Sequence, residues 1–186
     1  MKKLQYNSPV ILSFFLLSLF ALALGYLTQD RSTALVFSVY RFSLKDILGY
    51  VRLFGHVLGH AGWEHFLGNM LLLLVVGPPL EEKYGSRALL AGIALTALLT
   101  GVLHCLLFGR VALLGASGVV FMLIMLSSLA GAREGQIPLT LILVAVLYLG
   151  QEVFAAVFVE DNVANLMHIA GGIIGAVYGF YLRSRN

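Results

Sequence analysis

Residues 164 to 182 read ANLMHIAGGIIGAVYGFYL, and this segment is the most informative one about the architecture of the chain. It is long enough and apolar enough to cross a bilayer as a helix. Gly171, Gly175 and Gly179 recur at four-residue spacing, and His168 lies on the same helix face, three residues before the first of them. Because a glycine face lets another helix approach very closely, we expect His168 to face a neighbouring helix and not lipid.

The rest of the chain repeats this apolar character. Of its 186 residues 60% are hydrophobic and only 11% are charged, which excludes an ordinary soluble domain. Five more apolar stretches precede the last one, at about 9 to 27, 65 to 80, 88 to 108, 117 to 131 and 138 to 158. The sequence therefore predicts an all-α membrane protein with six transmembrane helices in one polytopic domain, residues 1–186.

The first stretch, 9 to 27, follows Lys2 and Lys3. It is a retained first transmembrane helix or the core of a signal peptide cut near Ala21 and Ala23, and its length favours the helix. The long first loop, about 28 to 64, mixes apolar residues with charges. We expect amphipathic segments there that lie at the membrane interface.

Basic residues set the expected orientation. With six spans both termini share one side, and that side holds seven of the 12 Lys and Arg residues. The positive-inside rule then predicts cytoplasmic termini, with a bacterial plasma (inner) membrane as the expected location. The net charge is only +3 and the basic residues are scattered, so nucleic acid is not an expected partner.

Two of the predicted spans are short. The second, 65 to 80, and the fourth, 117 to 131, would be about 24 Å and about 22 Å long as helices, against an apolar core of about 30 Å. If both reach the cytoplasmic face, both begin below the outer surface. Pro78, Pro79 and Gly85 predict a turn after the second span, and Gly131, Gly135 and Pro138 predict another after the fourth.

Ser117 lies in the run Gly115-Ala116-Ser117-Gly118, where a loop is expected to become the fourth span. A serine in a membrane helix is often only a small packing residue that bonds to its own backbone. The flanking glycines, however, let the backbone turn sharply and approach a substrate closely. His168 likewise is either a structural histidine or a functional one, since an ionisable group inside a span points to function.

His65 and Asn69 share one face of the second span at i, i+4 spacing. They form either an interhelical hydrogen-bond pair or a pair of donors to an oxyanion. His56 and His60 have the same spacing, but no cysteine or second ligand cluster accompanies them, so we expect no metal. Cys105 cannot form an intrachain disulfide and is expected to be buried as a small apolar residue.

Taken together, these motifs resemble those of the rhomboid intramembrane serine proteases, over about residues 50 to 182. The family's histidine-asparagine pattern is matched by His60, His65 and Asn69. Its Gly-x-Ser-Gly is matched by Gly115, Ser117 and Gly118, and its last motif by His168, Gly171 and Gly175. Glu81, Gly85 and Ser86 match the family's turn after the second helix.

The resemblance implies a six-helix rhomboid-like bundle that hydrolyses peptide bonds with a Ser-His dyad and no cofactor. Ser117 would be the nucleophile and His168 its general base. The amide of Ser117, with His65 and Asn69, would hold the oxyanion. Substrates would be membrane-anchored proteins, cut in or near their transmembrane helix.

The chain departs from the family pattern at two positions. Val51 precedes Arg52 where the family often has Trp, and Phe121 stands where it often has Tyr. The Phe121 ring is expected to pack against His168 in place of the tyrosine. The fifth span resembles the helix beside which substrate enters in the family. Gln151 and Glu152 are polar residues on this span, and they either belong to that role or lie at the membrane interface.

Two rival functions come from other classes. A non-catalytic rhomboid-like protein would bind transmembrane helices, but it would need neither nucleophile nor base. A small transporter would need an inverted repeat or paired broken helices, and the sequence has neither. The substrate and the oligomeric state are not encoded in any motif of the sequence.

Overall fold

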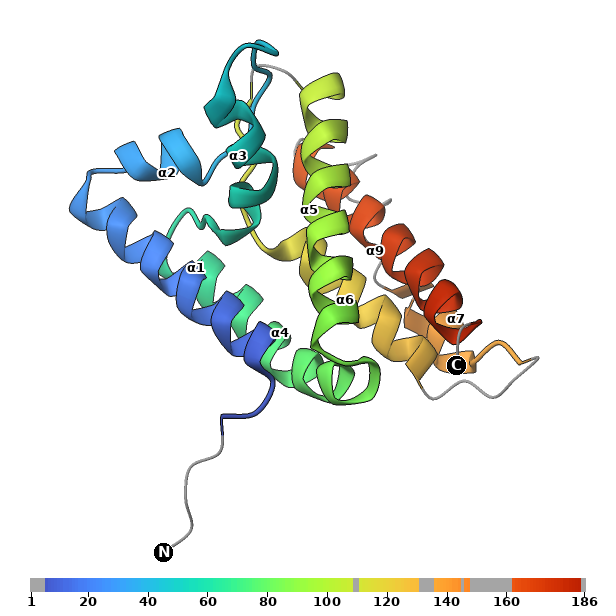
Figure 1. Cartoon of the computed structure of the whole chain (residues 1–186). Helices are drawn as coiled ribbons and strands as arrows, with labels where there is room; N and C mark the ends of the chain where they lie inside the picture. The colour runs from blue at the N-terminus through green and yellow to red at the C-terminus, as the bar shows by residue number, and fades with distance from the viewer. Residues whose placement is uncertain (1–5, 109–110, 131–135, 145, 148–161, 185–186) are drawn as a thin grey trace, which may run out of the picture.

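The computed structural model describes residues 6–108, 111–130, 136–144, 146–147 and 162–184, and these form helices joined by short turns (Figure 1). The elements are α1 Pro9–Leu27, α2 Arg31–Val36, α3 Ile47–Gly55, the 3-10 turn η1 His56–Leu58, α4 Trp63–Tyr84, α5 Ser86–Leu107, α6 Ser117–Ala130, α7 Leu139–Val144 and α9 Asn162–Arg183. Within the described residues β pairing is limited to an isolated antiparallel bridge between Val39 and Leu113. The predicted all-α class is therefore confirmed.

The helices α1, α5, α6 and α9 coincide with the first, third, fourth and sixth predicted spans. Three of these elements are long and apolar enough to cross a membrane, namely α1, α5 and residues 165–183 of α9. The helix α6 has 14 residues, which is about 21 Å. In the part of the chain that the structure describes, three full-length spans are thus present, and a count of six remains a prediction.

The prediction for the second span was wrong at its end. The helix α4 has 22 residues and continues through Pro78 and Pro79 to Tyr84, where a turn was expected. A proline inside a helix removes one backbone hydrogen bond, and its ring crowds the carbonyl group four residues before it, so this continuation has a cost. The last turn of α4 is stabilised by a contact with another helix, because the Glu81 carboxylate binds the start of α1. The helix α4 is therefore about 33 Å long and not short, although it is not among the three full-length spans.

Glu81 joins α4 to the start of α1. Its two carboxylate oxygens accept the backbone N–H groups of Val10 at 2.9 Å and Ile11 at 3.0 Å, and the Ser86 hydroxyl donates to the same carboxylate at 2.7 Å. These N–H groups are in the first turn of α1, where the preceding residue, Ser8, makes no side-chain cap. A carboxylate from another helix thus caps α1 and complements its dipole.

The predicted fifth span begins as expected. The helix α7 starts at Leu139, directly after Pro138, and ends at Val144. Residues 148–161, which include Gln151 and Glu152, lie outside the described residues, as do residues 131–135 of the predicted turn. The predictions for these positions therefore stay predictions.

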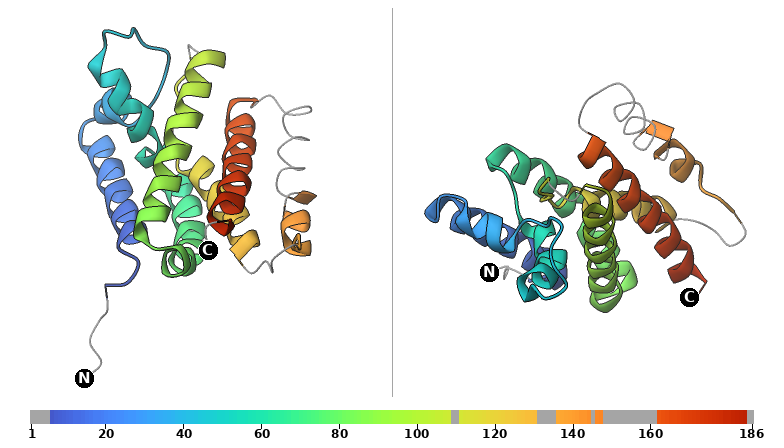
Figure 2. Two further views of the ribbon diagram at one scale, coloured as in Figure 1. Left: turned by 45° about the vertical axis from the view of Figure 1, so that its right-hand side comes forward. Right: turned by 90° about the horizontal axis from the view of Figure 1, so that it is seen from above.

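The helix α6 is the centre of the bundle. Its residues Val119, Met122, Leu123 and Leu126 are fully buried, and it packs against α4, α5 and α9. Figures 1 and 2 show that α6 begins partway through the height of the bundle, whereas α5 spans that height. Ser117, which opens α6, is partly buried, and its neighbours Ala116 and Gly118 are buried.

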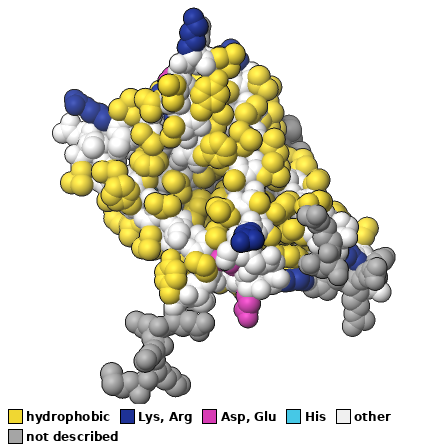
Figure 3. Space-filling model, viewed as in Figure 1, with side chains coloured by type: hydrophobic (Ala, Val, Ile, Leu, Met, Phe, Trp, Pro, Cys, Tyr) yellow, Lys and Arg dark blue, Asp and Glu magenta, His cyan; other side chains and the backbone are white. Residues whose placement is uncertain are grey.

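The outer surface is largely apolar. Hydrophobic side chains cover the middle of the face in Figure 3, and Lys, Arg and acidic side chains lie toward its margins. The start of α1, the end of α4 and the end of α9 lie at one end of the bundle in Figure 1, and the segment before α3 lies at the other. This distribution fits a bilayer as the surrounding solvent.

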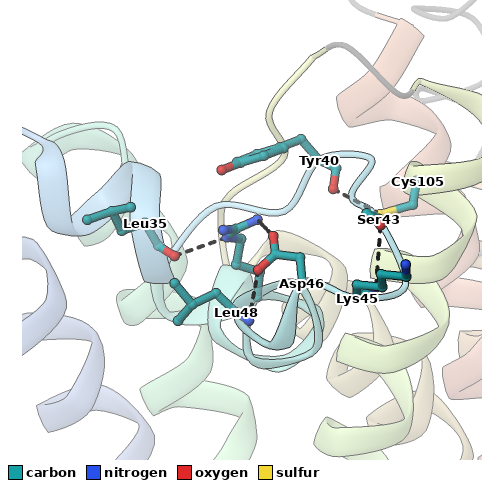
Figure 4. A network of polar contacts seen from close by, with 8 residues as sticks. Leu35, Tyr40, Ser43, Lys45, Asp46, Leu48 and Cys105 are labelled. Atoms are coloured by element: carbon teal, nitrogen blue, oxygen red, sulfur yellow. Dashed lines mark hydrogen bonds and ion pairs between the residues drawn. The ribbon is translucent and has the colours of Figure 1, made fainter.

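Arg52 anchors the segment between α2 and α3 (Figure 4). Its guanidinium is buried, donates to the Leu35 carbonyl at 3.0 Å, pairs with Asp46 at 3.2 Å and lies over the Tyr40 ring at 4.6 Å. The arginine therefore fixes this segment although it is preceded by Val51 and not by a tryptophan.

Candidate active site

Ser117 is the first residue of α6 and is partly buried. The chain reaches it through Gly115, whose φ of +131° is a conformation that side chains other than hydrogen rarely allow. The Gly115 N–H donates to the His56 carbonyl at 2.9 Å. The turn into the helix is thus fixed from the side of η1, and Gly115 is a glycine for a conformational reason.

The glycine face of α9 packs on α6, as its spacing predicted. A Cβ on Gly171 would collide with the backbone of Gly118, and one on Gly175 would collide with the backbone of Met122. The two helices are therefore in backbone contact over a full turn. Farther along, Gly179 faces the side chains of Leu126 and Leu129 and not the backbone.

This packing brings His168 to the side of α6. Its imidazole ring stacks on the Phe121 ring with centroids 4.6 Å apart and an angle of 7° between the planes. Phe121 lies one helical turn after Ser117, on the same face of α6. The predicted contact of Phe121 with His168 is therefore present.

His65 reaches the same place from α4. A Cβ on Gly115 would lie 2.8 Å from Cε1 and 2.9 Å from Nε2 of the His65 ring, and 3.8 Å from the Ser117 Oγ. The bare backbone of Gly115 thus leaves room for His65 beside Ser117. His65 and His168 are also near enough to interact electrostatically.

Hydrogen bonds determine which N–H groups of His65 and Asn69 can donate to a further acceptor. The Ala61 N–H donates to Nδ1 of His65 at 3.4 Å, so the neutral ring carries its hydrogen on Nε2, the nitrogen beside Gly115. The buried Asn69 amide donates one hydrogen to the His65 carbonyl at 2.9 Å and retains a second. Both side chains can therefore donate to an additional acceptor.

His56 and His60 are buried beside this site. The pKa of each is lowered to about 4, mainly by burial and in smaller part by a neighbouring histidine, His104 for His56 and His65 for His60. Each ring uses Nδ1 toward a carbonyl oxygen, of Arg52 and Leu58 respectively. No group of three potential metal ligands occurs among the described residues.

His104 has a place in this region that the sequence did not reveal. It is fully buried on α5, and its Nε2 lies 2.7 Å from the Val111 carbonyl, in the segment that leads to Ser117. A histidine inside a predicted span is itself a signal of function or of a specific contact. The sequence showed such a histidine at position 104, but no motif indicated which residue it contacts.

A family model described as the Rhomboid domain matches residues 48–185. The chain is 33% identical to rhomboid-related protein 2 of Mus musculus over 144 residues, covering 69% of this chain and 47% of the mouse protein. It is 31% identical to rhomboid protease GlpG of Pectobacterium atrosepticum, covering 70% and 48% of the two chains. It is 34% identical to RHOMBOID-like protein 1 of Arabidopsis thaliana, covering 69% and 33%.

Proposed function

This chain belongs to the rhomboid family, and from that premise we propose that it is an intramembrane serine endopeptidase. The family consists typically of such enzymes, and several relatives are named as proteases. The part of the chain that matches covers slightly less than half the length of the first curated relatives. The activity, the substrate and the partners are therefore proposals for this chain.

One observation carries the proposal, which is the close packing of α9 on the start of α6. Gly171 lies against the Gly118 backbone, and His168 stacks on Phe121 one turn after Ser117. A nucleophile and a base from two helices thus belong to one small region that also contains His65. Packing alone gives no reason for a serine, two histidines and an asparagine there, whereas acyl transfer uses a nucleophile, a base and donors to the oxyanion.

The reaction follows from these groups. Ser117 Oγ attacks the carbonyl carbon of the scissile peptide bond while His168 takes the hydroxyl proton. The oxyanion is held by the Ser117 N–H, by Nε2–H of His65 and by the remaining amide hydrogen of Asn69. His168 then gives its proton to the leaving amine, and water, activated by the same histidine, releases the acyl group from Ser117.

The substrate class and the location follow from the surroundings. We propose a membrane-anchored protein as substrate, cut in or near its transmembrane helix, because the site lies within a bundle whose outer surface is apolar. The termini are proposed to be cytoplasmic, since Lys83 and Arg183 are in the last turns of α4 and α9, and both helices end where α1 begins. Residues 1–186 act as one polytopic domain in this proposal.

The experiment is labelling with a fluorophosphonate, which reacts with an activated serine, followed by cleavage of a model transmembrane substrate. Wild type should be labelled and should cleave. Ser117→Ala and His168→Ala should each abolish cleavage, and the double variant should be no worse, because the two residues act as one unit.

Ser128→Ala is the matched control, because the Ser128 hydroxyl donates to the Ile124 carbonyl within α6. Cleavage that survives in Ser117→Ala would refute the assignment, and an unlabelled, inactive wild type would favour a non-catalytic helix-binding protein.

A further inference from the structure

The segment that leads into Ser117 is tethered at every second residue. The Val111 carbonyl faces His104, Leu113 exchanges two backbone hydrogen bonds of 2.8 Å with Val39, and the Gly115 N–H donates to the His56 carbonyl. Alternation of this kind is typical of extended backbone, in which successive groups point to opposite sides. One edge of residues 111–116 is thus bound to α5, η1 and the segment at Val39.

The first of these tethers is the one made by a side chain. His104 lies on the last turn of α5, fully buried, and its ring stacks on Phe108 with centroids 5.8 Å apart. A carbonyl oxygen can only accept, so Nε2 of His104 carries the hydrogen and donates it to Val111 at 2.7 Å. The other two tethers join backbone groups on both sides and depend on no side chain.

His104 also fixes where the segment leaves α5. The Phe108 N–H completes the helix by donating to the His104 carbonyl at 2.8 Å, and the Val111 N–H donates to Phe108 at 2.9 Å. Val111 is therefore bound both to Phe108, the residue that follows α5, and to His104. Without the ring donor, the Val111 carbonyl would lose its hydrogen bond at the point where the direction of the segment is set.

We propose that His104 is a positioning residue for catalysis, which holds residues 111–116 through the Val111 carbonyl and so fixes the place of the Ser117 hydroxyl and amide. The proposal rests on the proposed function, since position matters for catalysis only if Ser117 reacts. The tether itself does not depend on activity. It can therefore be tested separately.

The test compares two amides that differ by one methylene. In His104→Gln the amide nitrogen reaches about where Nε2 lies, whereas in His104→Asn it falls short of Val111. Thr96→Val is the matched control, because Thr96 is also fully buried on α5 but donates only to Gly92 within the helix. The full chain is used in each case, and the measurements are amide hydrogen exchange over residues 111–118 and kcat and KM for one transmembrane substrate.

In His104→Asn we expect exchange over residues 111–118 to be about ten-fold faster, because one hydrogen bond of the segment is lost. We expect kcat to fall by about 10- to 100-fold with KM within about two-fold, since displacement of the nucleophile affects the reaction and not capture of the substrate. His104→Gln and Thr96→Val should resemble wild type in both measurements.

Three results would separate the explanations. Unchanged exchange in His104→Asn, or a defect in His104→Gln equal to that in His104→Asn, would overturn the proposal and leave only packing of the ring. Should His104→Asn fail to fold, His104→Phe keeps the ring volume without a donor and takes its place. A wild type that neither cleaves nor reacts with the probe would refute the protease proposal and the catalytic part of this one, while exchange would still decide the tether.

Discussion

Gly171 of α9 lies directly on the backbone of Gly118 of α6, so that a Cβ added to Gly171 would be 2.9 Å from the Gly118 Cα. Backbone cannot move aside as the end of a flexible side chain can. The separation of α6 and α9 near Ser117 is therefore set by the absence of a single methyl group.

A valine at this position should separate the two helices. Gly171→Val should lower the rate of substrate cleavage by on the order of 100-fold, because a displacement of about 1 Å near a catalytic pair has effects of that size. Gly179→Val should be milder, since Gly179 faces the leucine side chains of α6, which can rotate. Both variants would be compared by yield, thermal unfolding and cleavage. Full activity in Gly171→Val would show that the glycine contact does not set the geometry of the site.

The donors to the oxyanion make a second prediction. His65→Ala and Asn69→Ala should each lower turnover by about 100- to 1000-fold, the typical effect of removing one such donor. Fluorophosphonate labelling of Ser117 should remain detectable, because the nucleophile and its base are intact. Leu71→Ala, at an exposed position on the same helix, is the control. Wild-type turnover in both variants would assign His65 and Asn69 to helix packing alone.

The parts of the fold that the sequence could predict are those with a local pattern. The length and apolarity of a helix are local, and so α1 was predicted to the residue. The spacing of Gly171 and Gly175 is local too, and it predicted a close helix contact on the side of His168. The start of α6 at Ser117 followed from Gly115 and its turn.

The parts that could not be predicted depend on residues far apart in the chain. The helix α4 runs past two prolines, and its last turn is fixed by the Glu81 carboxylate on the start of α1. The pairing of Val39 with Leu113 and the contact of His104 with Val111 likewise leave no periodic pattern in either partner. A family motif can mark such residues as important but does not supply the contact.

The trans-helix cap predicts a stability defect without a direct effect on chemistry. Glu81→Ala should lower the free energy of unfolding by about 3 kcal/mol, because the N–H groups of Val10 and Ile11 lose a charged acceptor at a partly buried helix start. Glu82→Ala, which removes an exposed carboxylate next to it, should have little effect. Thermal unfolding of the purified variants measures both. Equal unfolding temperatures for wild type and Glu81→Ala would mean that water can replace this cap.

The buried histidines of the first loop predict the response to acid. Burial holds the pKa of both His56 and His60 at about 4, against about 6.5 in the unfolded chain. Between these values the unfolded chain binds protons that the folded chain does not. Stability from this source is therefore complete above about pH 6.5, falls as the pH drops toward 4, and falls no further below that.

The size of this effect can be measured with one substitution. A shift of this kind corresponds to at most about 3 kcal/mol for each histidine. His60→Phe keeps a ring against Phe66, where the two centroids are now 5.4 Å apart, but cannot be protonated. Unfolding temperatures recorded from pH 7 to pH 4 should fall less steeply in His60→Phe than in wild type, and the two curves should diverge mainly below pH 6.5. Unfolding is the proper readout, because His60 also contacts His65 and a change in activity would have two causes. Parallel curves over the whole range would show that His60 is protonated as readily in the folded protein as in the unfolded chain, and that its burial does not govern acid stability.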